Sequence, residues 1–208
     1  MGRGTSRVRL ACAAVVLVGL TGCSTQPSAE TAPPVIPPAQ PAAPASGPGT
    51  YLGQAVNGIG APIPVRVTIG PDTSVPPSPE AEAVGAYLRA AAAELSASVP
   101  TVRYVDVGID NTGEIDAVPL PGNVDVLDVD GQGANFRPAY DVVRENQELL
   151  PADSALSQQG AVLAQQLLVR DNSVRPGQVA AVPYVSNDRL AGVEQVVVDG
   201  ELARKDDA

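Results

Sequence analysis

The chain has 208 residues, of which 13 are basic and 23 acidic, and it contains no histidine and only two cysteines. An acidic surface does not neutralise phosphate groups, so we expect no nucleic-acid partner. The lack of histidine removes the commonest general base and the usual zinc ligands. The sequence therefore predicts a protein that is not an enzyme and that has no cofactor, apart from the calcium ion considered below.

The first 22 residues have the pattern of a lipoprotein signal peptide. Three arginines precede a short apolar run from residue 10 to residue 20, which is too short to cross a bilayer as a stable helix. The run ends in Leu20-Thr21-Gly22-Cys23, which resembles the lipobox of bacterial lipoproteins. The resemblance implies cleavage just before Cys23 and a diacylglyceryl group on its thiol. The alternative is an ordinary secretory peptide with a chance cysteine.

Lipidation at Cys23 would anchor the protein to the extracytoplasmic face of the cell membrane. The processed chain would have 186 residues, with 10 basic and 23 acidic side chains and a formal charge of −13. Cys12 lies in the segment that would be removed, so no thiol would remain for a disulfide or for catalysis. The abundance of Ala, Gly, Val, Pro, Arg and Asp indicates a high-GC genome, such as that of a high-GC Gram-positive bacterium.

Three regions are expected after the signal peptide. Residues 23–50 hold the lipidated cysteine and a Pro/Ala-rich tether, which has too little apolar surface to offset its ordering entropy. The alternative for this segment is a Pro-rich ligand of a partner domain. Residues 51–203 form the globular domain, and residues 204–208 form a polar tail.

Two helices are expected in the domain. In residues 78–97, Ser78 is a suitable N-cap, Pro79 suits the first helical position, and apolar residues recur at helical spacing. Residues 154–171 also show helical spacing, although Gly160 weakens it, so a strand remains the alternative.

Alternating apolar residues predict the strands. The expected strands cover residues 63–69, 102–110, 124–127, 179–185 and 193–198, with an edge strand or loop around Val118 and Leu120. In the second of these, Val105 and Ile109 lie on one face, and Asp106 and Asp110 lie on the other. We interpret the two aspartates as part of the solvated face of the sheet.

Three motifs occur in an order that resembles the telokin-like, immunoglobulin-fold family of Gram-positive secreted proteins and lipoproteins. A strand with alternating valines ends in Asn-Thr-Gly at Gly113, a second strand ends in Asp128-Val129-Asp130-Gly131, and a Pro176-Gly177-Gln178 turn precedes a third. The resemblance covers roughly residues 102–200 and implies an antiparallel immunoglobulin-like β-sandwich. The predicted fold class is mainly β, with one or two added helices at about 78–97 and 154–171, which depart from the family pattern.

A calcium site is the sharpest hypothesis for a metal. The hard oxygen ligands Asp125, Asp128, Asp130 and Asn135 surround Gly131. The spacing does not fit an EF-hand, because its twelfth position would be Arg137. The alternative is an ordinary turn between strands.

Three functions remain open from the sequence. The leading hypothesis is a lipid-anchored envelope lipoprotein that displays a non-catalytic binding or structural module to a protein or cell-wall partner. The second is an accessory lipoprotein that binds a small ligand or calcium for a membrane complex. The third is an envelope carbohydrate hydrolase, for which paired carboxylates would be needed.

Overall fold

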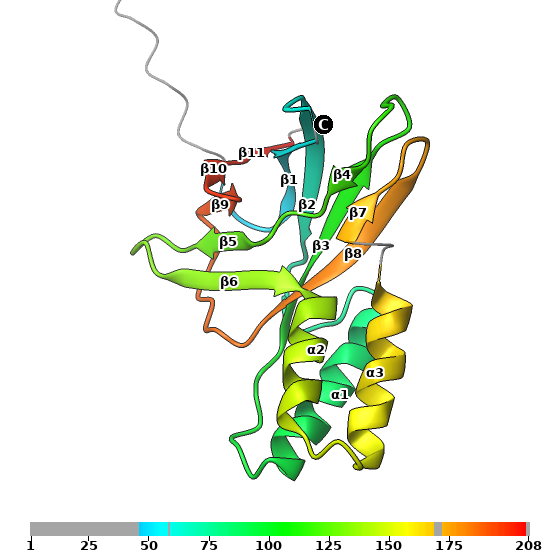
Figure 1. The fold of residues 1–208 in the computed structure, drawn as a ribbon. Coiled ribbons are helices and arrows are strands. Elements are labelled where there is room, and N and C mark those ends of the chain that lie inside the picture. Colours follow the sequence, from blue (N-terminus) through cyan, green and yellow to red (C-terminus); the bar gives the residue numbers. More distant parts are fainter. Residues whose placement is uncertain (1–45, 58, 169–171, 207–208) are drawn as a thin grey trace, which may run out of the picture. The chain divides into compact units, whose positions relative to one another are not determined.

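The computed structural model describes residues 46–57, 59–168 and 172–206, which form a curled antiparallel sheet and three helices (Figure 1). The main sheet contains nine strands: β1 (Gly49–Val56), β2 (Pro62–Ile69), β3 (Arg103–Asp110), β5 (Val124–Leu127), β6 (Gly133–Pro138), β8 (Val179–Ser186), β9 (Gln195–Val198), β10 (Glu201–Leu202) and β11 (Arg204–Lys205). A two-stranded sheet pairs β4 (Val118–Pro119) with β7 (Ser173–Val174). The helices are α1 (Pro79–Glu94), α2 (Ala139–Leu149) and α3 (Ala155–Leu167). The mainly β, antiparallel class with added helices is confirmed.

The two ends of the main sheet meet. The strand order is β10-β9-β5-β6-β8-β3-β2-β1-β11, and only Ala203 separates β10 from β11 in the chain. The sheet therefore curls until β1 approaches β9. Gly53 of β1 makes this approach possible, because a Cβ at that position would lie 2.8 Å from a methyl group of Val198. The sheet is thus nearly closed, like a barrel.

The inside of the curled sheet is the larger apolar core. It is built from the alternate residues of the strands, so Val105, Val107 and Ile109 of β3 are buried as their spacing predicts. Tyr184 of β8 lies in the same core, and its hydroxyl donates a hydrogen bond of 2.6 Å to the carbonyl of Pro121. A second core lies between the three helices and one end of β3 and β8, with Tyr104 and Val185 on the sheet side.

The two predicted helices form, with shorter bounds than expected. The Ser78 hydroxyl caps α1 by accepting a bond of 3.2 Å from the Ala81 amide, and the Ser154 hydroxyl caps α3 by accepting one of 2.9 Å from Ser157. Helix α1 ends at Glu94, three residues before the predicted end, because the chain turns at Ser96 with a φ of 54°. The predicted residues 169–171 of the second helix lie outside the described part of the chain.

Gly160, which weakens the helical pattern of α3, is required by the packing of this helix against α1. A Cβ at this position would overlap the hydroxyl and ring of Tyr87 from α1. The glycine therefore lets the two helices approach closely through the tyrosine ring. Glycine costs the helix about 1 kcal/mol relative to alanine, and the contact between Tyr87 and α3 offsets this cost.

Several elements differ from the sequence prediction. Strand β1 begins at Gly49, so the last two residues of the expected tether pair with β2 instead. Strand β11 occupies Arg204 and Lys205 of the expected polar tail and pairs with β1. Strand β6 and helix α2 have no counterpart in the prediction. Helix α2 is amphipathic, but Pro138 stands at its N-cap position and no side chain caps it, so its start carries no capping signal in the sequence.

Two of the three sequence motifs contact one another. The buried Asn111 side chain donates hydrogen bonds to the carbonyls of Asp116, at 2.9 Å, and Val174, at 2.8 Å. The Asn111 backbone exchanges two further bonds with Gly177 and Gln178 of the Pro-Gly-Gln turn. The Asn-Thr-Gly and Pro-Gly-Gln motifs therefore act together to tie the ends of β3 and β8 to the small β4–β7 sheet.

Candidate functional site

The lipobox residues Leu20, Thr21, Gly22 and Cys23 lie outside the described part of the chain. Lipidation at Cys23 therefore stays a prediction. In the residues that the structure does describe, no helix is long and apolar enough to span a membrane.

The proposed calcium ligands lie at two places along the β5–β6 hairpin. Asp125 and Asn135 are directly opposite each other in the ladder, and their side chains are joined by a hydrogen bond of 2.6 Å. Asp128 begins the turn, where one carboxylate oxygen accepts hydrogen bonds of 3.0 Å from the amides of Asp130 and Gln132. The Asp125 and Asp128 carboxylates thus already accept hydrogen bonds from neighbouring groups.

Calcium binding at this hairpin is tested by titration during thermal unfolding. Within the described ranges, no group of three or more His, Cys, Asp or Glu side chains is arranged to hold a metal ion. The calcium hypothesis predicts a rise in the midpoint of unfolding at millimolar calcium, and Asp128→Asn should remove that rise. A midpoint that calcium leaves unchanged would end the hypothesis.

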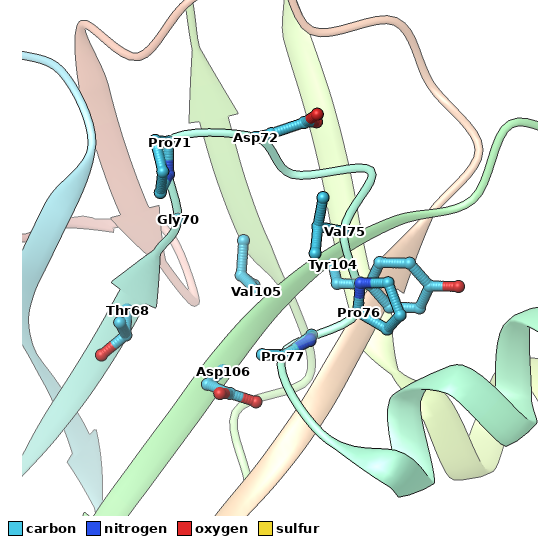
Figure 2. A pocket seen from close by; sticks show the side chains of 10 residues that line it. All are labelled: Thr68, Gly70, Pro71, Asp72, Val75, Pro76, Pro77, Tyr104, Val105 and Asp106. Carbon is cyan, nitrogen blue, oxygen red and sulfur yellow. The ribbon is translucent and has the colours of Figure 1, made fainter.

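A pocket of about 270 Å³ lies where the connection from β2 to α1 passes over β3 (Figure 2). Its surface is predominantly apolar. The connection contributes Gly70, Pro71, Asp72, Val75, Pro76 and Pro77, and the strands contribute Thr68, Tyr104, Val105 and Asp106.

Hydrogen bonds fix the connection that walls the pocket. Thr73 is buried, its carbonyl accepts a bond of 2.7 Å from the Tyr104 amide, and its hydroxyl accepts one of 3.1 Å from Arg103. The Asp72 carboxylate accepts bonds from the amide and hydroxyl of Ser74, and Figure 2 shows it pointing away from Asp106. Three prolines stiffen the same segment. The pocket is therefore largely formed before any ligand arrives.

Asp106 is partly buried in this pocket, and its carboxylate has no partner in the part of the chain that the structure describes. Among the described residues, none donates a hydrogen bond to its carboxylate or forms an ion pair with it. Burial alone raises the pKa of the Asp106 carboxyl above its ordinary value. The folded protein therefore holds this proton to higher pH than the unfolded chain, so ionisation of Asp106 costs stability as the pH rises through the raised pKa.

Asp110, four residues along the same face of β3, has the opposite environment. It is exposed, and one carboxylate oxygen accepts hydrogen bonds of 3.0 Å from the Thr112 amide and 2.6 Å from the Thr112 hydroxyl. These bonds lower the pKa of the Asp110 carboxyl. Its contribution to stability is present at neutral pH and is lost as the pH falls through the lowered pKa.

The interpretation of both aspartates as solvated is therefore wrong for Asp106. Tyr104, on the same face, is buried under the helices, and Asp106 lies at the boundary of that covered region. Period-two spacing gives the face correctly, but it does not tell which part of the face another segment covers. One feature of the sequence could have indicated that a segment covers this part of the face. It is the apolar Val75-Pro76-Pro77 stretch, which directly precedes the Ser78 cap of α1.

A second, open hollow of about 590 Å³ lies further along the same face. Thr68 and Asp106 are paired in register across β2 and β3, and the next pair on that face is Arg66 and Gly108. The floor of the hollow consists of small and apolar residues. The residues that line it are Ile63, Pro64, Arg66, Gly108, Ile109, Asp110, Thr112, Gly113, Glu114, Val179, Ala180 and Ala181. We call the pocket and the hollow together the β2–β3–β8 surface.

Comparison with family models, with curated proteins and with solved structures finds no match in any of the three. The resemblance to the telokin-like family therefore stays a prediction. The function must be argued from the β2–β3–β8 surface itself.

The two aspartates of this surface do not have the spacing of a glycosidase pair. Asp106 and Asp110 are four residues apart on one strand, which corresponds to about 13 Å. A pair of carboxyl groups in a glycosidase lies about 5–10 Å apart. Neither aspartate has a histidine to work with, since the chain contains none.

Proposed function

We propose that the chain is a lipid-anchored cell-envelope lipoprotein that displays a non-catalytic binding module, and that its partner binds on the β2–β3–β8 surface. The observation that carries the second part is the hollow along the outer face of β2, β3 and β8. Val179 is 66% exposed at the edge of this face, and Ala181 and Pro64 are exposed as well. A hollowed face with an apolar floor and charged rim is typical of interaction sites.

The anchoring part of the proposal rests on the signal sequence and on the Pro/Ala-rich segment that follows Cys23. Such a segment favours an extended conformation of about 3.1 Å per residue. A domain on a tether of this kind can reach partners away from the membrane. The telokin-like resemblance is consistent with the same setting, a secreted protein or lipoprotein of a Gram-positive bacterium.

Binding of a small ligand on behalf of a membrane complex is the second candidate. The apolar pocket favours it, but a volume of about 270 Å³ lies below the usual range of about 300–1,000 Å³ for ligand sites. The larger and more open part of the surface fits an extended partner better. We therefore place the small ligand second.

Photo-crosslinking on intact cells tests the binding surface. A photoreactive amino acid at Ala181, in the floor of the hollow, is expected to give a discrete adduct with an envelope component. The control is the same amino acid at Gln158, which is exposed on α3. Equal adducts from both positions, or an adduct only from Gln158, would contradict the proposed surface.

A further inference from the structure

The unpaired carboxylate of Asp106 is the feature of this surface that most needs a partner. A charge that leaves water without a counter-charge or hydrogen bonds is costly, and buried charges in proteins are normally paired. Asp106 pairs with Thr68 on one side and with Pro183 on the other in the ladder. Pro183 has no N–H to offer, and the Thr68 hydroxyl forms no bond to the carboxylate in the described structure.

The arginines that the described structure places on β2 and β3 have other partners. Arg66 lies on the same face of β2, and its Nη1 is 3.4 Å from the Asp206 carboxylate. Arg103 begins β3, and its guanidinium donates to the Thr73 hydroxyl and to the Asp188 carbonyl. The pKa of Asp106 is shifted by burial with no contribution from either arginine. A counter-charge for Asp106 would therefore come from outside the described residues.

The walls of the pocket set the rest of the ligand's chemistry. Val75, Pro71 and Pro77 supply apolar surface, and Figure 2 shows these residues together with Asp106 around the pocket. The complementary group is an aliphatic chain that ends in a cation. The small volume fits one side chain better than a whole drug-sized ligand. The formal charge of −10 also favours a basic partner, because it attracts positive charge over several ångströms.

We propose that the pocket at Asp106 receives a lysine or arginine side chain of the protein partner, with the aliphatic stem against Pro71, Val75 and Pro77 and the cationic head on the Asp106 carboxylate. This inference rests on the proposed binding function and specifies which side chain of the partner contacts the pocket. The hollow then accommodates the residues of the partner that flank the basic side chain. Binding then supplies a counter-charge that Asp106 does not find among the described residues.

Two matched peptides test the role of the charge. The probes are the acetylated, amidated tripeptides Ala-Lys-Ala and Ala-norleucine-Ala, which have the same aliphatic stem with and without the ammonium group. Each is titrated into the lipidated, ¹⁵N-labelled protein in non-ionic detergent, and the amide signals of Thr68, Val75 and Asp106 are followed. The lysine peptide is expected to bind at least about tenfold more tightly than the norleucine peptide.

The variants Asp106→Asn and Asp110→Asn assign the effect to one carboxylate. Asp106→Asn should abolish the preference for lysine over norleucine, and Asp110→Asn should leave it unchanged. Equal binding of the two peptides by the unaltered protein, or a preference that survives Asp106→Asn, would overturn the proposal. If Ala181 still crosslinks while the lysine peptide fails, the binding surface is retained and only the chemistry of the pocket is wrong.

A third probe, the pentylammonium ion, distinguishes a partner's side chain from a free small cation. If pentylammonium binds at least about tenfold more tightly than the lysine peptide, the backbone of the peptide is being excluded. That result would make the pocket a site for a small organic cation and would overturn the side-chain proposal. Comparable binding of both supports it.

The thermal stability of the same two variants gives an independent readout. Asp106→Asn removes an unpaired charge, so the midpoint of unfolding of the free protein at pH 7 should rise. Asp110→Asn removes a carboxylate that accepts two hydrogen bonds, so the midpoint should fall. The gain from Asp106→Asn should shrink as the pH is lowered and Asp106 itself becomes protonated. A fall in the midpoint with Asp106→Asn would show that this carboxylate is already satisfied by the fold.

Discussion

Replacing Asn111 by alanine is expected to lower the free energy of unfolding by about 3 kcal/mol. The side chain is fully buried and donates to the carbonyls of Asp116 and Val174, which would be left without these donors. A buried polar group that loses its partner costs about 1–3 kcal/mol. Urea unfolding followed by circular dichroism measures the change directly.

Asn135→Ala is the matched control for Asn111→Ala. Asn135 also donates a side-chain hydrogen bond, to Asp125, but it is only partly buried on the β5–β6 hairpin. Water can replace the lost bond there, so we expect a cost below about 1 kcal/mol. Similar costs for the two variants would show that Asn111 does not tie the ends of β3 and β8 together as the structure indicates.

Replacing Cys23 by alanine is expected to move the protein out of the membrane fraction or to leave it as the unprocessed precursor. Each buried methylene of a lipid chain contributes about 0.8 kcal/mol to membrane binding, and two or more chains hold a protein stably. Loss of the thiol removes all of these chains together. Membrane fractionation and the intact mass of the protein report both outcomes.

Cys12→Ala is the control for this experiment, because the sequence places Cys12 in the segment removed on processing. This variant should be processed, lipidated and retained in the membrane like the unaltered protein. A Cys23→Ala protein that remains in the membrane at the mature mass would exclude lipidation at this position. Such a result would leave the binding surface untouched, since the surface is argued from residues of the sheet.

The elements that the sequence predicts well are those whose signal is local. The alternation of Val105, Val107 and Ile109 places β3 and its buried face, and the serines at 78 and 154 mark two helix starts. Strand β1 was missed because two glycines interrupt its pattern, although Gly53 is required by the approach of Val198 from the far end of the sheet. Helix α2 was missed because Pro138 precedes it in place of a capping side chain.

The sequence by itself determined that this is a mainly β protein with one or two added helices, and that Asp106 and Asp110 share one face of a strand. Their different environments were decided only by the tertiary structure. Asp110 meets Thr112 in its own turn, whereas Asp106 lies under a proline-rich connection that is distant in the chain. Alternation along a strand is a local property, but burial depends on which segment covers the face. For this reason the carboxylate that we propose to bind a partner is distinguished from Asp110 only in the folded protein.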